Sequence, residues 1–335
     1  MRDLKMPRSW VGRVPVLLCL GLLACGDSVD LGSNGSNGPS EPAGTRTVEI
    51  LADQQYVTSA LAVDETHVYW ANSGRRSNGF DDGTVQRIPK AGGPTELLGT
   101  ALEGPSALAL DATHVYWMQD NGLLRVPKSG GTPEARGYSG GGIAVDDGSV
   151  YWTDDAKVQR AAKATLETPA DIAVQQQNAH DLVVDATHVY WASQGRFDAS
   201  QASLYVDGSI SRALKGGGPT EVLAAQQHGA TSVTLHDGRL YWITEGRIAW
   251  MENAPGAPVS QVPGVSDAVA FLLLGDTLYW TDRFQIVRQK LSGEGAEQIA
   301  KEARIFFLAS DGSHLYFATQ GGLDAPDSTV FVTQL

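Results

Sequence analysis

The stretch DATHVYW occurs twice in this chain, at residues 111–117 and 185–191, and DETHVYW stands at 64–70. Four looser copies are DDGSVYW (146–152), HDGRLYW (236–242), LGDTLYW (274–280) and DGSHLYF (311–317). The copies end at Trp70, Trp117, Trp152, Trp191, Trp242, Trp280 and Phe317. They recur about every 40 residues, a period typical of β-propeller blades. The repeat is therefore predicted to build the fold, with its aromatic rings packed between neighbouring blades.

Each repeat is flanked by segments that read as three further strands. In the first unit, the small apolar run SALAVD (59–64) precedes the turn and suits an inner strand beside a narrow axis. After VYW come TVQRIPK (84–90), the Gly-rich turn AGGP (91–94) and TELLGT (95–100), read as third strand, turn and outer strand. The sequence thus predicts four-stranded blades.

The two ends of the repeat region complement each other. The last unit stops after STVFVTQL (328–335), one strand short, while VEILADQQ (48–55) reads as an outer strand without a blade of its own. Joining the two completes a seventh blade and leaves no open sheet edge. We therefore expect an all-β fold, a seven-bladed β-propeller spanning 46–335 and closed by its N-terminal strand.

Two copies of the repeat continue as YWTD, at 151–154 and 279–282. In these units the chain resembles the YWTD-repeat propellers of lipoprotein-receptor ectodomains and related bacterial propeller lipoproteins. The other units read YWAN, YWMQ, YWAS, YWIT and YFAT, and the receptor propellers have six blades where seven are counted here. The resemblance implies a propeller fold and leaves activity open.

The N-terminus reads as a signal peptide. Basic residues precede the apolar run VPVLLCLGLLA (14–24), which is too short for a permanent membrane span. It ends at LLAC, which looks like a bacterial lipobox and would place a lipid on Cys25. Residues 1–24 are therefore predicted as the signal and 25–45, rich in Gly, Ser, Asn and Pro, as a flexible tether. By the resemblance to enterobacterial lipoproteins, Gly26 after the cysteine implies the outer membrane of a bacterial envelope.

Charge and motifs exclude several functions. A net charge of −13 without a basic stripe argues against nucleic-acid binding. HExxH and phosphate-loop motifs are missing from the sequence, and its Asp-rich stretches lack the spacing of a calcium loop. We expect no cofactor, no metal and a monomer.

The basic residues of the repeat are predicted to be structural. His67, His114, His188 and His314 share one slot of the turn and cannot converge on one site. The third-strand arginines are expected to stack on aromatic rings or to pair with turn aspartates; they are Arg87, Arg125, Arg160, Arg212 and Arg288.

His180 and His228 break the pattern, because both fall in connections from an outer strand to the next inner strand. These connections open at the channel mouth of adjacent blades, so the two rings could approach each other. The alternative to a binding protein is therefore a propeller-type lyase, lactonase or other hydrolase with one of these histidines as general base and nearby aspartates for a metal. Exposed loop histidines without catalytic function remain the simpler interpretation.

Three long loops follow second strands, at 71–83, 192–208 and 318–328 in blades one, four and seven. Exposed aromatic and arginine side chains on irregular loops are typical of binding faces. The candidate binding residues are Arg75, Arg76, Phe80, Arg196, Phe197 and Tyr205. The favoured hypothesis is a non-enzymatic, lipid-anchored binding or scaffolding module whose loop face engages an envelope protein or a glycan.

Overall fold

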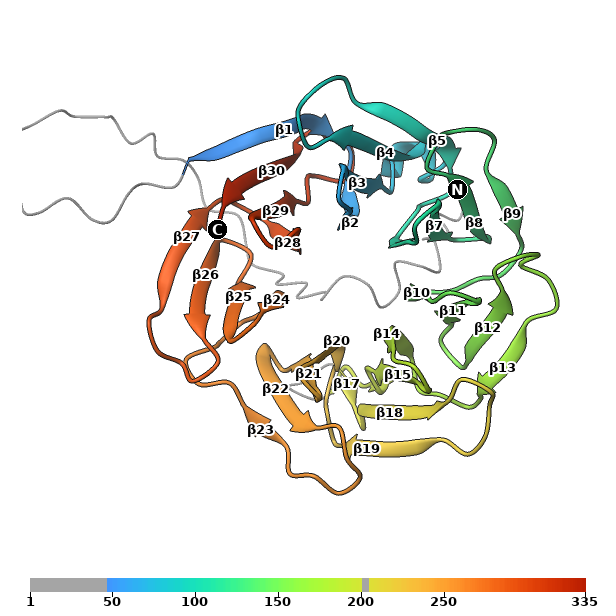
Figure 1. Ribbon diagram of the computed structural model, residues 1–335, viewed down its shortest axis with the longest axis vertical. Coiled ribbons are helices and arrows are strands. Elements are labelled where there is room, and N and C mark those ends of the chain that lie inside the picture. Colours follow the sequence, from blue (N-terminus) through green and yellow to red (C-terminus); the bar gives the residue numbers. More distant parts are fainter. Residues whose placement is uncertain (1–46, 201–204) are drawn as a thin grey trace, which may run out of the picture.

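The computed structural model describes residues 47–200 and 205–335. Seven antiparallel sheets of four strands stand around a central axis like the blades of a propeller (Figure 1). The predicted fold class, blade number and strand number are confirmed. The predicted signal peptide, the tether and Cys25 lie outside the described residues.

The strands of each blade run from the axis outward in chain order. Blade 1 holds β2 (Thr58–Val63), β3 (His67–Asn72), β4 (Gly83–Pro89) and β5 (Glu96–Leu102). Blade 2 holds β6 (Ala107–Leu110), β7 (His114–Gln119), β8 (Gly122–Pro127) and β9 (Glu134–Arg136). Blade 3 holds β10 (Ile143–Val145), β11 (Ser149–Thr153), β12 (Val158–Ala162) and β13 (Ala170–Ala173).

Blade 4 holds β14 (Ala179–Val184), β15 (His188–Ser193), β18 (Ser209–Leu214) and β19 (Glu221–Ala225). Blade 5 holds β20 (Thr231–His236), β21 (Arg239–Thr244), β22 (Arg247–Glu252) and β23 (Ser260–Gln261). Blade 6 holds β24 (Ala270–Leu274), β25 (Thr277–Thr281), β26 (Gln285–Lys290) and β27 (Glu297–Lys301).

Blade 7 closes the ring. It holds β28 (Ile305–Ser310), β29 (His314–Thr319), β30 (Ser328–Gln334) and, as its outer strand, β1 (Val48–Gln55) from the start of the described chain. The two ends pair antiparallel, with Val48 opposite Thr333 and Ile50 opposite Phe331. The predicted closure is confirmed, and in Figure 1 the blue strand β1 lies beside the red strand β30.

The repeated aromatic residues form the core between blades. Each of the seven hydrophobic clusters contains the Tyr of one blade and the Trp or Phe of the next, as with Tyr69 and Trp117. Tyr and Trp are consecutive on a strand, so their side chains point to opposite sides of the blade. Both rings are at most 6% exposed in every blade, and burying such a ring stabilises the fold by roughly 2–3 kcal/mol.

Candidate functional site

The ring has two unlike faces, because successive strands of a blade run antiparallel. The face with the turns between first and second strands is here called the turn face. The opposite face, called the loop face, carries the loops after second strands and the connections between blades. All three long loops therefore belong to the loop face, together with His180 and His228.

The long loops of blades 1 and 7 are joined to each other. Arg76 N donates to Leu323 O at 2.9 Å, and Ser77 N donates to the Asp324 carboxylate at 2.6 Å. Residues Arg76–Asn78 form a single 3-10 turn at the tip of the blade 1 loop. The two loops therefore make one continuous, hydrogen-bonded surface.

Arg75 and Arg76 differ in how firmly they are held. Arg75 Nε pairs with Asp82 Oδ2 at 2.5 Å, and its guanidinium lies 5.3 Å from the Tyr56 ring centre. The hydrogen bond and charge of Asp82 raise the pKa of Arg75. The side chain of Arg76 is exposed. Arg75 therefore fixes the loop, whereas Arg76 is presented to solvent.

The expectation of an exposed Phe80 is wrong. Its ring is only 4% exposed, and its backbone has a positive φ of 64°. Phe80 N donates to Arg75 O, and Phe80 O accepts from Gly104 N, both at 2.9 Å. Phe80 therefore closes the blade 1 loop against the connection to blade 2, and its ring offers a partner almost no surface.

The blade 4 loop contains a short hairpin that was not predicted. β16 (Arg196–Phe197) pairs with β17 (Tyr205–Val206), and the Phe197 and Tyr205 rings meet edge to face at 5.7 Å. Phe197 is 58% exposed, and the Arg196 side chain is 61% exposed. One hairpin thus exposes an aromatic ring and, on the neighbouring residue, a guanidinium.

Backbone contacts seat this hairpin on the connection that carries His228. Gly229 N donates to Gln194 O at 3.0 Å, and Gln227 N donates to Gly208 O at 2.8 Å. Two glycines allow the close approach: a Cβ on Gly195 would lie 2.0 Å from Val206 O, and one on Gly208 would lie 2.0 Å from Gln227 O. The hairpin base is therefore rigidly placed.

His180 lies at the inner edge of blade 4, where the pairing of β14 with β15 is irregular between Ala179 and Leu182. Its Nδ1 lies 3.0 Å from Asp181 Oδ2, which also accepts Ser232 N of blade 5 at 2.7 Å. The Nε2 atom is fully covered and has no hydrogen-bond partner. A substrate cannot reach this nitrogen unless the ring moves.

His180 and His228 make no contact with each other in the described residues, although they lie in connections of adjacent blades. His228 O accepts from Thr244 Oγ1 at 3.0 Å, and its Nδ1 is buried without a partner. Within residues 47–200 and 205–335, no hydrogen bond or ring contact joins His180 to His228. The same residues contain no group of three or more His, Cys, Asp or Glu that could hold a metal ion.

The turn face carries an ion-pair arrangement that the sequence analysis missed. In blade 1, the Asp64 carboxylate accepts the N–H groups of Thr66 and His67 and the Tyr69 hydroxyl at 2.8–2.9 Å. Lys128 from blade 2 then pairs with Asp64 at 2.7 Å. The repeated aspartate therefore ties its own turn, its own tyrosine and the next blade together.

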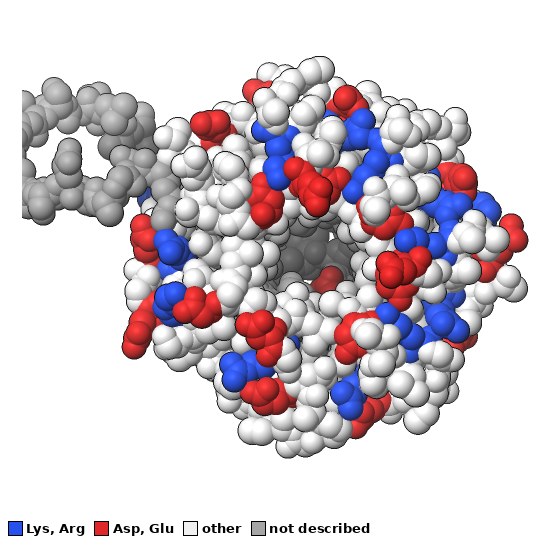
Figure 2. All heavy atoms as spheres, viewed as in Figure 1, with Lys and Arg blue, Asp and Glu red and all other residues white. Residues whose placement is uncertain are grey.

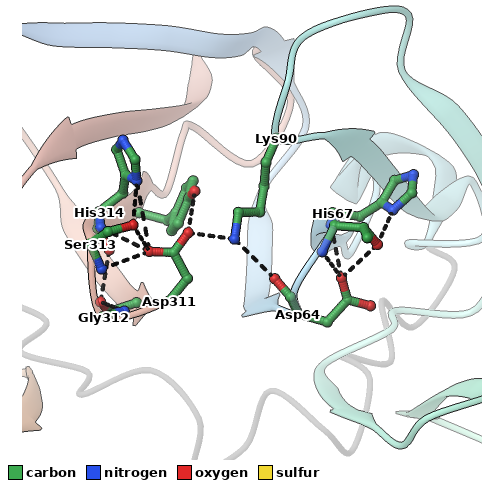
Figure 3. A network of polar contacts seen from close by, with 10 residues as sticks. Asp64, His67, Lys90, Asp311, Gly312, Ser313 and His314 are labelled. Atoms are coloured by element: carbon green, nitrogen blue, oxygen red, sulfur yellow. Dashed lines mark hydrogen bonds and ion pairs between the residues drawn. The ribbon is translucent and has the colours of Figure 1, made fainter.

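The same bridge occurs at four consecutive junctions. The pairs are Lys90–Asp311 (2.5 Å), Lys128–Asp64, Lys163–Asp111 and Lys215–Asp146 (each 2.7 Å). Figure 3 shows Lys90 between two blades, donating to Asp311 on one side and to the Asp64 carbonyl on the other. Each lysine directly follows the third strand of its blade, at the equivalent position of four repeats. This repeated position is the sequence signal for the bridges.

The third-strand arginines pair differently from the prediction. Arg87, Arg125, Arg212 and Arg288 bind glutamates of the outer strand of their own blade, as in the pair of Arg212 Nε and Glu221 at 2.8 Å. Arg87 and Arg125 also donate to the carbonyl groups of Lys128 and Lys163 in the following blades. The arginine guanidinium has enough N–H donors to bind both the glutamate of its own blade and the carbonyl of the following blade. The aspartate of the repeated turn is bound by the lysine of the following blade instead.

These contacts control protonation on the turn face. Burial alone would raise the pKa of Asp64, but the Lys128 ammonium and hydrogen bonds from the turn and Tyr69 hold it well below its usual value. The same balance lowers the pKa of Asp146 to about 2. Burial, with the Asp64 hydrogen bond, raises the pKa of Tyr69 to about 12. The aspartates are therefore ionised and the tyrosines protonated at neutral pH.

The turn-face histidines are structural. In His67, His114, His188 and His314, ring Nδ1 lies 2.7–2.8 Å from the hydroxyl of the preceding Thr or Ser.

Figure 2 shows one face of the ring, on which acidic and basic side chains lie beside one another around a central opening. In the described part of the chain, no helix is long and apolar enough to cross a bilayer.

Comparison with known proteins supports the fold. The sequence matches no protein-family profile and no curated protein. A chain of a nidogen/laminin complex is similar in structure, with TM-score 0.53 and 18% identity over 68% of this chain and 95% of that one. The extracellular domain of a one-component system from B. thetaiotaomicron gives TM-score 0.63 and 10% identity over 87% of this chain and 40% of that chain.

A gluconolactonase from Xanthomonas campestris is also similar, with TM-score 0.54 and 15% identity over 87% of this chain and 90% of that chain. At these identities the likeness shows the propeller fold alone. The neighbours include a protein from a binding complex and an enzyme, so the function must be argued from this chain's own residues.

Proposed function

We propose that this protein is a lipid-anchored binding module of a bacterial envelope, which engages an envelope protein through its loop face. A single observation carries the proposal: Phe197 and the Arg196 side chain are both exposed on a hairpin whose base is fixed by backbone hydrogen bonds. Exposed aromatic and arginine side chains on a rigid support lose little entropy on binding and commonly dominate interface energies.

The joined loops of blades 1 and 7 support the same conclusion. Because Arg76 is exposed while Arg75 and Phe80 hold the loop in place, this second part of the loop face is preorganised as well. The exposed Phe197 ring favours a protein partner over a glycan, which would require mainly polar contacts, and a glycan remains an outcome of the test.

The anchoring part of the proposal rests on the sequence LLAC before Gly26. Labelling of cells with radioactive palmitate should mark the wild-type protein and leave Cys25→Ser unlabelled, and the variant should leave the membrane fraction. A Cys25→Ser protein that still carries the label and sediments with membranes contradicts the anchor.

Crosslinking of the protein to envelope extract tests the binding face. The double variant Arg196→Ser, Phe197→Ser should lose the captured partner by at least about tenfold, as expected for truncation of an interface anchor. Leu97→Ser is the control, because Leu97 is 60% exposed but lies near the start of the outer strand β5, away from the loop face. Equal capture by wild type and the double variant, or equal loss in the control, rejects the loop-face proposal.

A hydrolase or lyase at the channel mouth is the second candidate, favoured by the 3.0 Å contact of His180 Nδ1 and Asp181 Oδ2. Such a pair orients an imidazole as a general base. Turnover of a panel of lactones that His180→Asn abolishes, while His67→Asn retains it, would support this candidate. Absence of turnover across the panel, or turnover that His180→Asn leaves unchanged, would count against it.

A further inference from the structure

A pocket of about 190 Å³ opens between blades 5 and 6, and neither the loop face nor the ion pairs account for it. Blade 5 supplies Arg239, Tyr241, Trp250 and Val262 to its wall. Blade 6 supplies Leu291 and Ser292, which directly follow β26. Because these residues lie where the second strand begins and the third strand ends, the pocket belongs to the turn face.

The pocket exists because blades 5 and 6 depart from the repeat at three positions that fill the equivalent space elsewhere. At the junction of blades 1 and 2, Arg87 lies opposite Tyr69 on the third strand and Lys128 crosses to Asp64. At the junction of blades 5 and 6, Trp250 lies opposite Tyr241. His236 stands in the aspartate position and Leu291 in the lysine position.

No ion pair can therefore form across this junction at those positions. His236 turns its Nε2 to the carbonyl of Gly275 at 2.6 Å. The Tyr241 hydroxyl thus lacks the aspartate that accepts Tyr69 in blade 1. The lysine that crosses each of four other junctions is replaced here by the apolar Leu291, and the His236 ring reaches across to a backbone carbonyl instead.

The walls are suited to an aromatic ring. The Tyr241 and Trp250 rings are stacked at 6.4 Å with an interplanar angle of 28°, and Val262 and Leu291 complete the apolar lining. A cavity of 150 Å³ with aliphatic and aromatic walls accepts benzene. At about 190 Å³, this pocket has room for one benzene-sized ring and a small substituent.

The rim selects the substituent. The Arg239 guanidinium lies 4.6 Å from the Trp250 ring centre, and its Nε pairs with Glu252 at 2.8 Å. Glu252 and the Tyr241 hydroxyl raise the pKa of Arg239, which is therefore charged. The rim thus offers donors from Arg239 and Ser292. Glu252 does not line the pocket, but as the partner of Arg239 it brings an acceptor next to the rim and balances the charge of the guanidinium.

We propose that the pocket between blades 5 and 6 binds a neutral phenolic ring, with the ring between Trp250, Val262 and Leu291 and the hydroxyl at Arg239 and Glu252. A hydroxyl can donate to the carboxylate and accept from the guanidinium. A benzoate of similar size brings a second carboxylate beside Glu252, so its charge is only partly compensated. A saturated ring of the same size loses the stacking with Trp250.

Titration of the purified protein with phenol, followed by ligand-observed NMR and calorimetry, tests the proposal. For about seven non-hydrogen atoms, a dissociation constant on the order of 1 mM is expected. Benzoate and cyclohexanol should bind about tenfold more weakly. N-acetyltyrosinamide distinguishes the source: binding of both it and phenol indicates a tyrosine side chain of a partner, and binding of phenol alone indicates a free small phenol.

The matched variants restore the repeat. Leu291→Lys and the double variant Trp250→Arg, Leu291→Lys place the residues of the other junctions into the pocket and should weaken phenol binding at least about tenfold. Lys163→Leu, at the junction of blades 2 and 3, controls for a general effect of altered junctions and should leave phenol binding unchanged. Because the double variant also alters a packed aromatic residue, the single Leu291→Lys variant decides the result if the double variant does not fold.

Equal phenol binding by wild type and Leu291→Lys would overturn the proposal. Binding of benzoate or cyclohexanol as tight as that of phenol would overturn it too, as would an absence of phenol binding at several millimolar.

Discussion

Junctions on the two sides of the ring are held by different forces. From blade 7 through blade 4, four lysines cross to aspartates of the preceding blade at 2.5–2.7 Å. Between blades 4 and 5 the position of the lysine is taken by Asn253, whose amide donates to the Tyr190 hydroxyl at 2.7 Å. Between blades 5 and 6, His236 takes the aspartate position and Leu291 the lysine position. Between blades 6 and 7, Leu274 takes the aspartate position and Leu335 the lysine position.

The aromatic packing is common to both halves, so the difference isolates the contribution of the polar bridges. Leu274 and Leu335 pack against the cluster of Tyr279 and Phe317, just as Val126 packs with Tyr69 and Trp117. The ring therefore closes with or without the bridges. The repeat tolerates the loss of an ion pair when both partners become apolar, as expected when a charge pair is replaced and no single charge is left behind.

Acidification should have the largest effect on this comparison. A lowered folded pKa means that the unfolded state binds more protons, so the stabilisation is complete above the unfolded value of 3.8 and is lost as pH falls towards about 2. Because the five turn aspartates are partly exposed, solvent screening reduces the contribution of each to about 1 kcal/mol, and together they should lower the free energy of unfolding by roughly 5 kcal/mol between pH 6 and pH 2. Urea unfolding at several pH values measures this loss.

Stability that stays constant from pH 5 to pH 2 would contradict the role of these carboxylates. Asp64→Asn serves as the control, since it removes one of the titrating groups. Its pH dependence should be shallower than that of the wild type by the contribution of one aspartate.

Alanine substitution of the first residue of the seven-residue repeat should destabilise a junction with a lysine bridge more than a junction without one. Asp64→Ala leaves the Lys128 ammonium, the Tyr69 hydroxyl and two turn N–H groups without their acceptor, which should cost about 3 kcal/mol. His236→Ala, at the equivalent position of blade 5, loses one hydrogen bond to Gly275 and should cost about 1 kcal/mol. Urea denaturation at pH 7 measures the free energy of unfolding of both variants. An equal loss in both would show that the lysine–aspartate bridge adds no stability beyond that of a single hydrogen bond.

A smaller effect on stability is expected from the tryptophans of the second strands. Their Nε1 groups have a hydrogen-bond acceptor in some blades and none in others. Trp191 Nε1 donates to Gln176 at 2.8 Å, whereas Trp152 Nε1 is buried without an acceptor. Trp191→Phe breaks a hydrogen bond and Trp152→Phe removes an unpaired donor. The first should therefore cost about 1 kcal/mol more than the second in thermal or urea unfolding. A larger loss for Trp152→Phe would contradict this assignment.

The sequence alone determined the architecture of this protein. Seven copies of a phrase with a turn, two consecutive large aromatic residues and a period of about 40 residues specify the blades, because each copy buries one ring on either side of its sheet. The incomplete last unit and the unpaired first strand likewise predicted the closure of β1 on β30.

The tertiary structure alone decided which side chains of different blades meet. Lys128 and Asp64 are 64 residues apart, and only the close approach of consecutive blades pairs them. Phe80 lies in a loop of mostly polar residues, yet the tertiary structure buries its ring. The pocket likewise forms only because Trp250 and Leu291, from two different blades, come together. A repeat fixes local geometry residue by residue, whereas contacts across a junction depend on two distant positions at once, so a change at either one alters the site.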